Sequence, residues 1–431
     1  MSETKEQPIQ IALLGLGTVG GGVFKLMNRL REELPMKVGA PVKITRILVR
    51  NRQKNRPGIP AELLTDDFQE ILMDPHIQIV VEVMGGIQPA CSYILAALTA
   101  GKSVVTANKD LLAERGRELL EAAAAHQADL LFEASVAGGI PIIRPLKECL
   151  AGNTITEVMG IINGTTNYIL TRMTRDGMEF SQALEQAQQL GYAEADPTAD
   201  IEGYDAGRKM AIMASIAFHS RVTFQDVHTQ GITAISARDI RYARELGCVI
   251  KLLGVARLGD AGIEVGVHPM LIPESHPLAN VNDAFNAVFL HGDAVDDAMF
   301  MGRGAGEMPT ASAVVGDIID AARNLQAGCT GRIGCSCYKD LPIRRAEDCE
   351  SRYFFRLQAE DRPGVLASIA SVFGNNGVSI AQVIQKTRSS GLAELVIITD
   401  RTVERHFADS IAILKGMSMV KEISAMIRVY P

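Results

Sequence analysis

A glycine-rich turn between an apolar strand and a helix constrains this chain more than any other feature. The turn, Gly15-Leu16-Gly17-Thr18-Val19-Gly20, follows the apolar run Ile9–Leu14 and precedes a predicted helix from Gly21 to about Leu34. Its first glycine permits a tight turn, the second lets the backbone approach a pyrophosphate, and the third lets helix and strand pack closely. The N-terminus of that helix would face the phosphates with unpaired N–H groups. With both flanks intact, we interpret the turn as a dinucleotide site rather than an ordinary strand–turn–helix.

Strands and helices continue to alternate along the first third of the chain. Apolar strands are predicted at Ile44–Val49, Ile77–Val83 and Ser103–Thr106, with a helix at Ala90–Ala100. This alternation is typical of α/β domains in which helices cover both faces of a doubly wound parallel sheet, the Rossmann-type fold. The chain has 431 residues, 47% of them hydrophobic, which allows about three domains with substantial cores.

The end of the second predicted strand bears on the choice of dinucleotide. An acidic residue there would accept a hydrogen bond from a ribose 2′-hydroxyl and favour NAD, whereas an arginine pairs with a 2′-phosphate. The strand ends in Arg50-Asn51-Arg52, without an acid. We therefore predict a preference for NADP(H), with Arg50 as the phosphate partner and NAD(H) still admissible. The alternative is a solvated basic loop.

Charge and composition exclude two classes of partner. A net charge of -7 gives the chain no field that would attract nucleic acid or an anionic membrane, and no apolar run reaches the length of a membrane span. The N-terminal segment, residues 1–8, is polar and does not resemble a signal peptide. Seven cysteines, an odd number, indicate reduced thiols. We expect a cytoplasmic protein without nucleic-acid or membrane partners.

Three loops after predicted strands carry polar groups. Lys109 follows Thr106-Ala107-Asn108 at the edge where ligands bind in such sheets, so it either contacts cofactor or substrate or is an ordinary surface lysine. The loop from Glu133 to Pro141 combines one carboxylate with several carbonyls, which would suit a hard cation. From these residues alone a tight turn is the better interpretation. Thr165 or Thr166 could cap a helix and still point a hydroxyl into a pocket, although capping alone would explain both.

The richest stretch lies between Gly191 and Lys209. Four acids precede Asp205, and Lys209 follows Asp205 by four residues, which makes the two neighbours on one helix face. Because the helix continues as an apolar run, partial burial would make the Lys209 proton transferable near neutral pH. The alternative is a solvated salt bridge worth about 0.3–0.5 kcal/mol.

This stretch resembles the signature of the homoserine dehydrogenase family at every fixed position. The resemblance extends over essentially the whole chain, through the glycine turn, Val105–Lys109, Glu133–Pro141, Asn163–Asn167 and Gly302–Gly306 with Pro309-Thr310. The matching signature residues are Ala187, Gly191, Tyr192, Ala193, Asp196, Pro197, Asp200, Ile201, Gly203, Asp205 and Lys209.

The resemblance implies an activity: reversible reduction of L-aspartate 4-semialdehyde to L-homoserine with NAD(P)H, on the route to threonine and methionine. It implies that Lys209 gives the aldehyde oxygen its proton and that Lys109 is a second lysine lining the site. Glu194 and Asp205 would hold the amino end of the substrate. The chemistry is consistent, because an aldehyde reduction needs a proton as well as a hydride and a positioned lysine can supply it.

Cofactor and cation positions also carry over from the resemblance. Gly191 and Gly306 match backbone positions near the cofactor, in addition to the glycine turn, Thr106 and Lys109. A monovalent cation, sodium, is implied to bind largely through main-chain carbonyls. Its matching positions are Glu133, Val136, Gly138 and Ile140.

After Asn324 the sequence changes character. Residues 326–351 contain glycine, proline, charged residues and four cysteines, and we interpret them as a flexible linker with reduced thiols. A zinc site is the weaker alternative, because the cysteine spacing lacks paired C-x-x-C knuckles and no histidine lies nearby. The cysteines are Cys329, Cys335, Cys337 and Cys349.

Beyond the linker a βαββαβ order is predicted. It resembles the ferredoxin-like ACT domain, a small regulatory module that binds amino acids; the alternative is an inert appendage that contributes only to assembly. The predicted elements are strands at Tyr353–Ala359, Val378–Lys386, Leu392–Asp400 and Val420–Val429, helices after Leu366 and over Val403–Met417, and a turn at Ser389-Ser390-Gly391.

The resemblance to an ACT-bearing member of this family implies threonine as a feedback inhibitor. Asp361, Gly364, Asn375 and Asn376 stand at the ligand-loop positions. Two other readings are disfavoured. A prephenate or 3-phosphoglycerate dehydrogenase with an ACT tail would not carry the Gly191–Lys209 signature, and a sensor with a dead dinucleotide fold would not need the lysines and acids intact.

The resulting domain plan has four parts. A Rossmann domain occupies residues 1–135, with a helix near 307–325 returning to it, and an α+β catalytic and dimerisation domain occupies 136–325. The linker 326–351 and an ACT domain over 352–431 complete the chain. A homodimer or homotetramer is expected.

Overall fold

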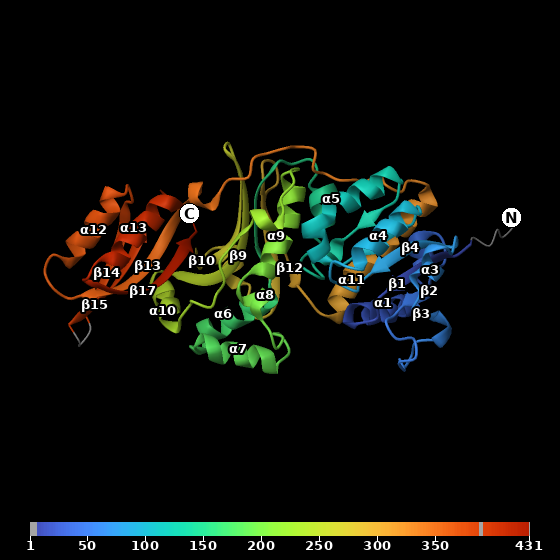
Figure 1. Ribbon diagram of the computed structural model, residues 1–431, viewed down its shortest axis with the longest axis horizontal. Helices are drawn as coiled ribbons and strands as arrows, with labels where there is room; N and C mark the ends of the chain where they lie inside the picture. The colour runs from blue at the N-terminus through green and yellow to red at the C-terminus, as the bar shows by residue number, and fades with distance from the viewer. Residues whose placement is uncertain (1–6, 388–390, 431) are drawn as a thin grey trace. The chain divides into compact units, whose positions relative to one another are not determined.

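The computed structural model describes residues 7–387 and 391–430, so the first six residues and Ser389 and Ser390 of the predicted turn lie outside the described residues. The chain divides into two compact units, each built from several segments (Figure 1). The first comprises Met1–Thr156, Ala211–Phe224 and Asn286–Asp340, and the second Glu157–Met210, Gln225–Phe285 and Leu341–Pro431. Residues 136–156, which the sequence plan assigned to the catalytic domain, belong to the first unit.

The first unit contains a parallel sheet with the strand order β3-β2-β1-β4-β5-β6. This is the order of a doubly wound dinucleotide-binding sheet, and it confirms the predicted fold class. The central strands are almost wholly buried because helices cover both faces. The strands are β1 (Ile9–Leu14), β2 (Val42–Leu48), β3 (Leu64–Thr65), β4 (Ile77–Glu82), β5 (Ser103–Thr106) and β6 (Leu130–Leu131).

The helix after the glycine turn differs from its prediction at both ends. α1 (Thr18–Arg29) begins directly after Gly17, and a separate α2 (Leu34–Val38) follows it. Pro35 stands in the first turn of α2, where its missing N–H costs nothing, whereas it could not continue α1. The single helix predicted to reach Leu34 is therefore two. The other helices here are α3 (Phe68–Leu72), α4 (Ala90–Thr99) and α5 (Lys109–Ala125).

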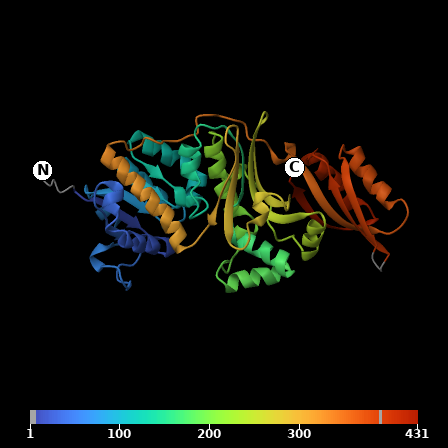
Figure 2. The same ribbon diagram turned by 180° about the vertical axis from the view of Figure 1, so that it is seen from behind.

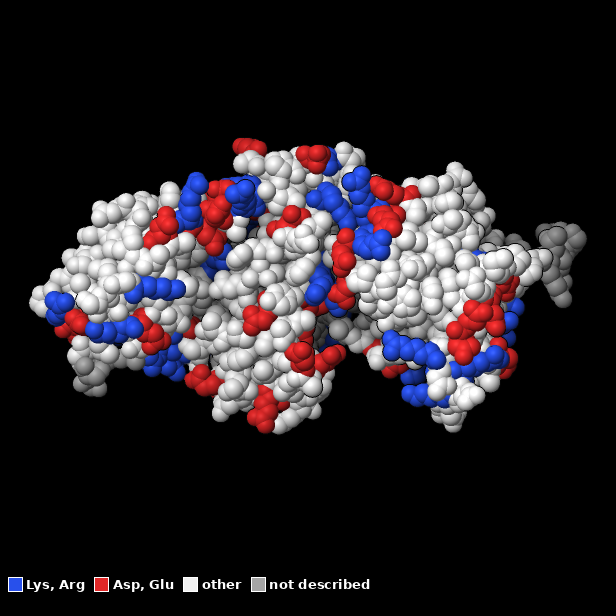
Figure 3. Space-filling model, in the orientation of Figure 1, with Lys and Arg blue, Asp and Glu red and all other residues white. Residues whose placement is uncertain are grey.

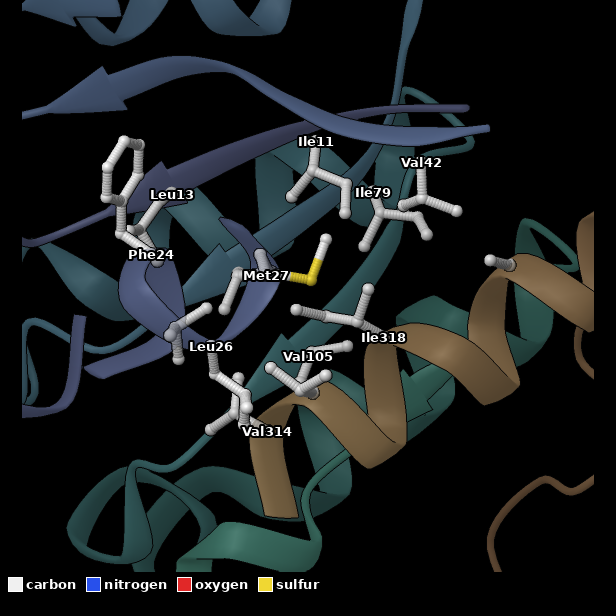
Figure 4. Close-up of a cluster of buried hydrophobic side chains, with 14 of the residues drawn as sticks. Ile11, Leu13, Phe24, Leu26, Met27, Val42, Ile79, Val105, Val314 and Ile318 are labelled. Atoms are coloured by element: carbon white, nitrogen blue, oxygen red, sulfur yellow. The ribbon is translucent and has the colours of Figure 1, made fainter. Parts of the chain in front are cut away.

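A helix from far along the chain completes this core. After the neighbouring strands β11 (Phe285–Gly292) and β12 (Asp296–Arg303), α11 (Glu307–Ala327) returns to pack against α1 (Figure 2). Val314 and Ile318 of α11 lie in one buried cluster with Met27 of α1 (Figure 4). A Cβ on Gly22 would lie 2.8 Å from the Glu307 carbonyl oxygen, so the bare glycine permits this close packing.

In the second unit, strands from the middle and the end of the chain join in one sheet, ordered β7-β9-β10-β17-β13-β15-β14. β9 and β10 pair antiparallel along their full length. A Cβ on Gly254 of β9 would meet the Met210 side chain at 2.3 Å, so this glycine lets α9 lie close on the strand. The middle elements are β7 (Ile155–Ile161), α6 (Gly164–Asp176), α7 (Phe180–Gln189), α8 (Thr198–Ile201), α9 (Tyr204–Ala217), β8 (His228–Thr229), α10 (Ala237–Glu245), β9 (Cys248–Gly259) and β10 (Gly262–Pro273).

The C-terminal region has the predicted βαββαβ order. Its core is aromatic: the rings of Phe355 and Phe373 meet edge to face at 5.8 Å, and those of Tyr353 and Phe407 stack at 3.9 Å. A short extra strand, β16 (Thr402–Val403), pairs with the start of the first strand. The elements are β13 (Glu350–Glu360), α12 (Val365–Asn375), β14 (Ile380–Thr387), β15 (Leu392–Thr399), α13 (Glu404–Gly416) and β17 (Val420–Val429).

A buried ion cluster fastens this region to α10. The Arg356 guanidinium donates to Asp239 at 2.7 Å and to Glu394 at 3.1 Å, and all three side chains are at most 6% exposed. The Tyr242 hydroxyl donates to Glu394 at 2.8 Å, and burial together with that carboxylate raises the pKa of Tyr242 well above its usual value. β17 extends the join by pairing in parallel with the end of β10.

The segment interpreted as a flexible linker is held in place at several points. The Lys339 N–H donates to the His219 carbonyl in the first unit. In the second unit, Ile263 donates to Pro342 and receives a hydrogen bond from Arg344, whose side chain also pairs with Glu264. These backbone hydrogen bonds hold residues 339–344 of the predicted linker against their neighbours.

Surface charge is mixed in sign. On the face drawn in Figure 3, basic and acidic side chains form small groups separated by large uncharged areas, without a broad basic field. No helix within residues 7–387 and 391–430 is long and apolar enough to cross a membrane.

Candidate active site

The glycine turn has the local geometry that a dinucleotide site needs. Gly15 has φ +101°, which favours glycine, and a Cβ on Gly20 would lie 2.2 Å from the Gly15 carbonyl oxygen. A Cβ on Gly17 would meet nothing within 4 Å, so the space over the start of α1 is open. The first N–H groups of α1 point into that space without a side-chain cap. These residues fit a bound pyrophosphate.

Arg50 lies two residues after the end of β2, on the sheet edge that carries the turn. It is exposed, and it pairs with no acidic side chain among the described residues. Its guanidinium is therefore available to an anion.

Two residues that the sequence analysis passed over build the adjoining loop. The Glu82 carboxylate, fully buried at the end of β4, accepts hydrogen bonds from the backbone of Met84 and Gly85 and from the Thr106 hydroxyl at 2.7 Å. Asn108 caps α5 and donates to the Gly86 carbonyl. Thr106, predicted to contact the cofactor, is fully buried, and its hydroxyl is spent on this network. Only its backbone could reach a ligand.

Lys109 and Gly306 also belong to the first unit. Lys109 is half-buried and is the first residue of α5. Gly306 has φ +124° and stands directly before α11. Lys109 therefore opens a helix, with its N–H donating to the Ala107 carbonyl at 3.1 Å, and Gly306 stands directly before another helix.

The loop predicted to hold a cation has its one carboxylate already engaged. Glu133 accepts three backbone hydrogen bonds, from Ile142, Ile143 and Arg144 at 2.6–2.8 Å. Ala137 and Gly138 both have positive φ, and a Cβ on Gly138 would lie 2.2 Å from the Gly304 carbonyl oxygen. The oxygens left for an ion in this tight loop are main-chain carbonyls, a donor set that fits a monovalent cation. Across the described residues no group of three His, Cys, Asp or Glu could hold a metal ion.

Burial raises the pKa of Asp317, behind this loop, to about 7, with the nearby Glu133 charge adding to the effect. Asp317 nonetheless accepts the Glu133 N–H and a hydrogen bond from Arg144. Asp317 therefore stabilises the loop through these two hydrogen bonds.

Lys209 and Asp205 meet on α9 as the four-residue spacing predicts. The Lys209 ammonium donates to Asp205 Oδ2 at 2.6 Å and to the Ile162 carbonyl at 2.8 Å, and the residues are 9% and 7% exposed. The alternative of a solvated surface pair is therefore wrong. Two of three ammonium protons have partners among the described residues, which leaves one for a ligand.

Asn163 and Asp200 complete this cluster, and the sequence analysis assigned neither a role. The Asn163 amide donates to Asp200 at 2.7 Å and to Asp205 at 2.9 Å. Asn163 also caps α6, where Thr166 supplies the N–H; Thr165 and Thr166 were the predicted caps. Burial raises the pKa of Asp200, and the Asp205 charge adds to this, while Asn163, Thr165 and Lys209 oppose it.

The remaining predicted residues of the second unit lie at the surface. Glu194 is exposed, and its carboxylate accepts no hydrogen bond within the described chain. Gly191, with φ +76°, ends α7 in the left-handed conformation that favours glycine. The Thr165 hydroxyl donates to the Tyr192 carbonyl at 2.7 Å and so ties α6 to this loop.

The four predicted regulatory residues separate into two pairs. Asp361 and Gly364 line a hollow beside β13 and the start of α12, together with Gln385. Asn375 and Asn376 lie at the opposite end of α12, about 15 Å away at 1.5 Å per residue. Within one chain they do not form one site.

The four linker cysteines are separated as well. Cys335 and Cys337 are close, since the Cys337 N–H lies 3.5 Å from the Cys335 sulfur. Cys329 belongs to the same unit, whereas Cys349 belongs to the other. All four are free thiols.

Three family models match consecutive parts of the chain. They are described as homoserine dehydrogenase NAD-binding domain for residues 15–133, homoserine dehydrogenase for 141–319 and ACT domain for 353–416. Homoserine dehydrogenase of Corynebacterium glutamicum is 47% identical over 426 residues, 97% of this chain and 95% of the relative.

Solved structures agree with the sequence relatives. The crystal structure of a homoserine dehydrogenase from Thiobacillus denitrificans is 42% identical, with a TM-score of 0.93 over 98% of both chains. A hyperthermophilic archaeal homoserine dehydrogenase mutant in complex with NADPH is 27% identical, with a TM-score of 0.63 over 73% of this chain and 98% of that one. With near-complete coverage at such identity, this chain belongs to the homoserine dehydrogenase family and is an oxidoreductase with a nicotinamide-binding domain and a C-terminal ACT domain.

Proposed function

We propose that this chain catalyses the reversible NAD(P)H-dependent reduction of L-aspartate 4-semialdehyde to L-homoserine, a step toward threonine and methionine. Lys209 carries the proposal. Its ammonium group is buried, held by one carboxylate and one carbonyl, and retains one proton for a ligand. A buried, oriented ammonium is suited to proton transfer to a carbonyl oxygen.

In this proposal a bound reduced nicotinamide would supply the hydride. Lys209 would donate its third proton to the aldehyde oxygen, and Asp205 would keep the ammonium aimed and limit its cost of burial. In the direction of homoserine oxidation the neutral amine would take the proton back. Lys109 stays a predicted second lysine of the site.

The exposed Glu194 carboxylate and the half-buried Asp200 are available for a substrate ammonium group. No group within the described chain donates a hydrogen bond to the Glu194 carboxylate, which supports its predicted role. Asp205 is already engaged by Lys209 and Asn163, so its predicted contact with the substrate would be shared with those donors.

A direct assay tests the activity. Purified chain incubated with L-homoserine and NADP⁺ should form NADPH and an aldehyde that a carbonyl reagent traps, and L-serine should give neither. No NADPH formation with L-homoserine at any pH between 7 and 10 would refute the proposed reaction.

The preference for NADP(H) is proposed on the position of Arg50. A guanidinium without an acidic partner at the end of β2 can pair with a 2′-phosphate. The NADPH in the archaeal relative is consistent with this. Arg50→Ala should raise the KM for NADPH about tenfold and leave the KM for NADH unchanged. Equal rises for both cofactors would exclude a 2′-phosphate contact.

A sodium ion at Glu133, Val136, Gly138 and Ile140 is proposed to bind through carbonyl oxygens of this loop. The engaged Glu133 carboxylate and the positive φ of Ala137 and Gly138 support a site made by the main chain. Replacing sodium by tetramethylammonium should lower the thermal midpoint of the protein as well as its rate. An unchanged midpoint and rate would argue for a plain turn.

Feedback inhibition by threonine is proposed to act through the hollow at Asp361 and Gly364. Gly364 has φ +91° and precedes α12, whose first N–H groups can hold a carboxylate, while Asp361 can hold an ammonium group. Asp361→Asn should weaken threonine inhibition about tenfold without changing kcat. Asp409→Asn, at an exposed carboxylate of α13, is the matched control and should be inhibited by threonine like the parent. A homodimer or homotetramer remains the predicted assembly.

A further inference from the structure

Asn163 stands where three functions meet: the start of α6, the paired carboxylates and the Lys209 ammonium group. It is 5% exposed. Its side-chain oxygen accepts the Thr166 N–H at 2.9 Å and the Thr166 hydroxyl at 3.0 Å. Its side-chain nitrogen donates to Asp200 and Asp205. Both ends of the amide are therefore fixed.

The orientation of this amide follows from its partners alone. A backbone N–H can only donate, so the atom facing Thr166 must be the oxygen. Carboxylates that are ionised can only accept, so the atom facing Asp200 and Asp205 must be the nitrogen. Asparagine is the residue that offers one acceptor and two donors on so short a side chain.

We infer that Asn163 is the positioning residue of this active site: it clamps Asp200 and Asp205 to the start of α6 and so holds Asp205 against Lys209. This inference rests on the proposed reaction and adds the element that sets its geometry. Asp205 Oδ2 accepts from Lys209 at 2.6 Å and from Asn163 at 2.9 Å, so the amide fixes the oxygen that the ammonium group uses.

The clamp also stabilises charge. Asp200 and Asp205 are two like charges that share one donor group, and Lys209 is the cation on the same cluster. Asp205 and Lys209, both on α9, act on Asp200 in opposite directions, while Asn163 and Thr165 supply hydrogen bonds. Removing the amide donors would disfavour the ionised form of Asp200, whose pKa burial already raises.

Ordinary helix capping is the competing explanation, and three substitutions distinguish it from the positioning role. Serine and aspartate are both good N-cap residues, whereas alanine is not. Asn163→Ser and Asn163→Asp therefore keep the cap but cannot donate two hydrogen bonds to the carboxylates. Asn163→Ala loses both roles.

The test is the pH dependence of kcat for homoserine oxidation, measured together with the thermal midpoint. We expect Asn163→Ser to lower the midpoint less than Asn163→Ala does, since it keeps the cap. Asn163→Asp should lower it further than Asn163→Ser at neutral pH, since its carboxylate meets Asp200 and Asp205. In Asn163→Ser and Asn163→Asp the acidic limb of the kcat–pH profile should move to higher pH by roughly half a unit or more. Asn163→Asp should move it furthest because it adds a negative charge. Asn163→Ala should show the shifted limb and a lower midpoint.

Ser236→Ala, which removes the cap of α10 in the same unit, should lower the midpoint and leave the limb in place. If Asn163→Ser and Asn163→Asp keep the limb of the parent, the positioning role is wrong and capping is sufficient. If the parent itself does not oxidise homoserine, the proposed reaction fails instead, so the two failures are distinguishable.

Discussion

Two buried lysines of the second unit, Lys209 and Lys251, use their protons differently. Lys251 is 3% exposed inside β9 and donates to three neutral oxygens, those of Asn167, Val281 and Asn282, at 2.6–3.2 Å. Lys209 is 9% exposed and spends two protons, one of them on a carboxylate. An ammonium group whose three protons all have partners stabilises a loop. An ammonium group that keeps one proton for a ligand, beside a carboxylate, can transfer that proton.

The surroundings of the two lysines reinforce this difference. Burial lowers the pKa of Lys251 to about 8, because no carboxylate contacts it among the described residues and the Arg175 charge also opposes its own. Asp205 gives Lys209 the counter-ion that Lys251 lacks. The comparison predicts a loss of turnover from one substitution and a loss of stability from the other.

The largest effect should follow Lys209→Ala. Loss of the proton donor should lower kcat for aldehyde reduction by about 100- to 10,000-fold, with NADPH binding unchanged. Single-turnover rates and NADPH fluorescence titration measure the two quantities. Lys209→Arg keeps the charge beside Asp205 but cannot release a proton, so it should be as slow as the alanine variant. Fast turnover by either variant would remove the distinction between the two lysines.

A smaller effect, on stability, should follow Lys251→Met. The substitution keeps the aliphatic stem but leaves three buried oxygens without their donor, which should cost about 1–3 kcal/mol in the free energy of unfolding. Urea denaturation would measure it. kcat should stay within about threefold of the parent, since Asn167, Val281 and Asn282 hold the protons of the Lys251 ammonium group. A drop in kcat as large as that of Lys209→Ala would show that both lysines serve the reaction.

The smallest effect concerns pH. With a pKa of about 8 in the folded state and about 10.4 when unfolded, Lys251 binds fewer protons folded than unfolded in that window. The free energy of unfolding should therefore rise with pH, by about 1 kcal/mol between pH 8 and 9. Lys251→Met should lack this rise. If the free energy of unfolding changes with pH in the same way in the parent and in Lys251→Met, the pKa of Lys251 lies outside this pH range.

Local spacing predicted what lies close in sequence. The glycine turn, the Asp205–Lys209 pair and the βαββαβ order of the C-terminal region follow from patterns a few residues long, and all three are present. The helix predicted to reach Leu34 ends at Arg29, and a separate helix with Pro35 in its first turn follows.

Long-range partners could not be read in the same way. Asn163 meets Asp205 across 42 residues, and Arg356 meets Asp239 across 117. Glu82 and Lys251 each end or interrupt an apolar run, where a lone charge carries no periodic signal. Asp361 and Asn376 seemed to share a loop cluster in sequence, but an intervening helix holds them at opposite ends.

The ion cluster at Arg356 has a consequence for how this protein can be recombined. Asp239 is fully buried on α10, and its counter-charge comes from β13. A truncation at the linker would leave that carboxylate in apolar surroundings without a partner, a loss of several kcal/mol. Chimaeras that exchange the ACT region with a relative should therefore carry α10 along with β13 and β17. The junction of such a chimaera should lie ahead of Ser236, more than 100 residues before residue 353, where the match to the ACT family begins.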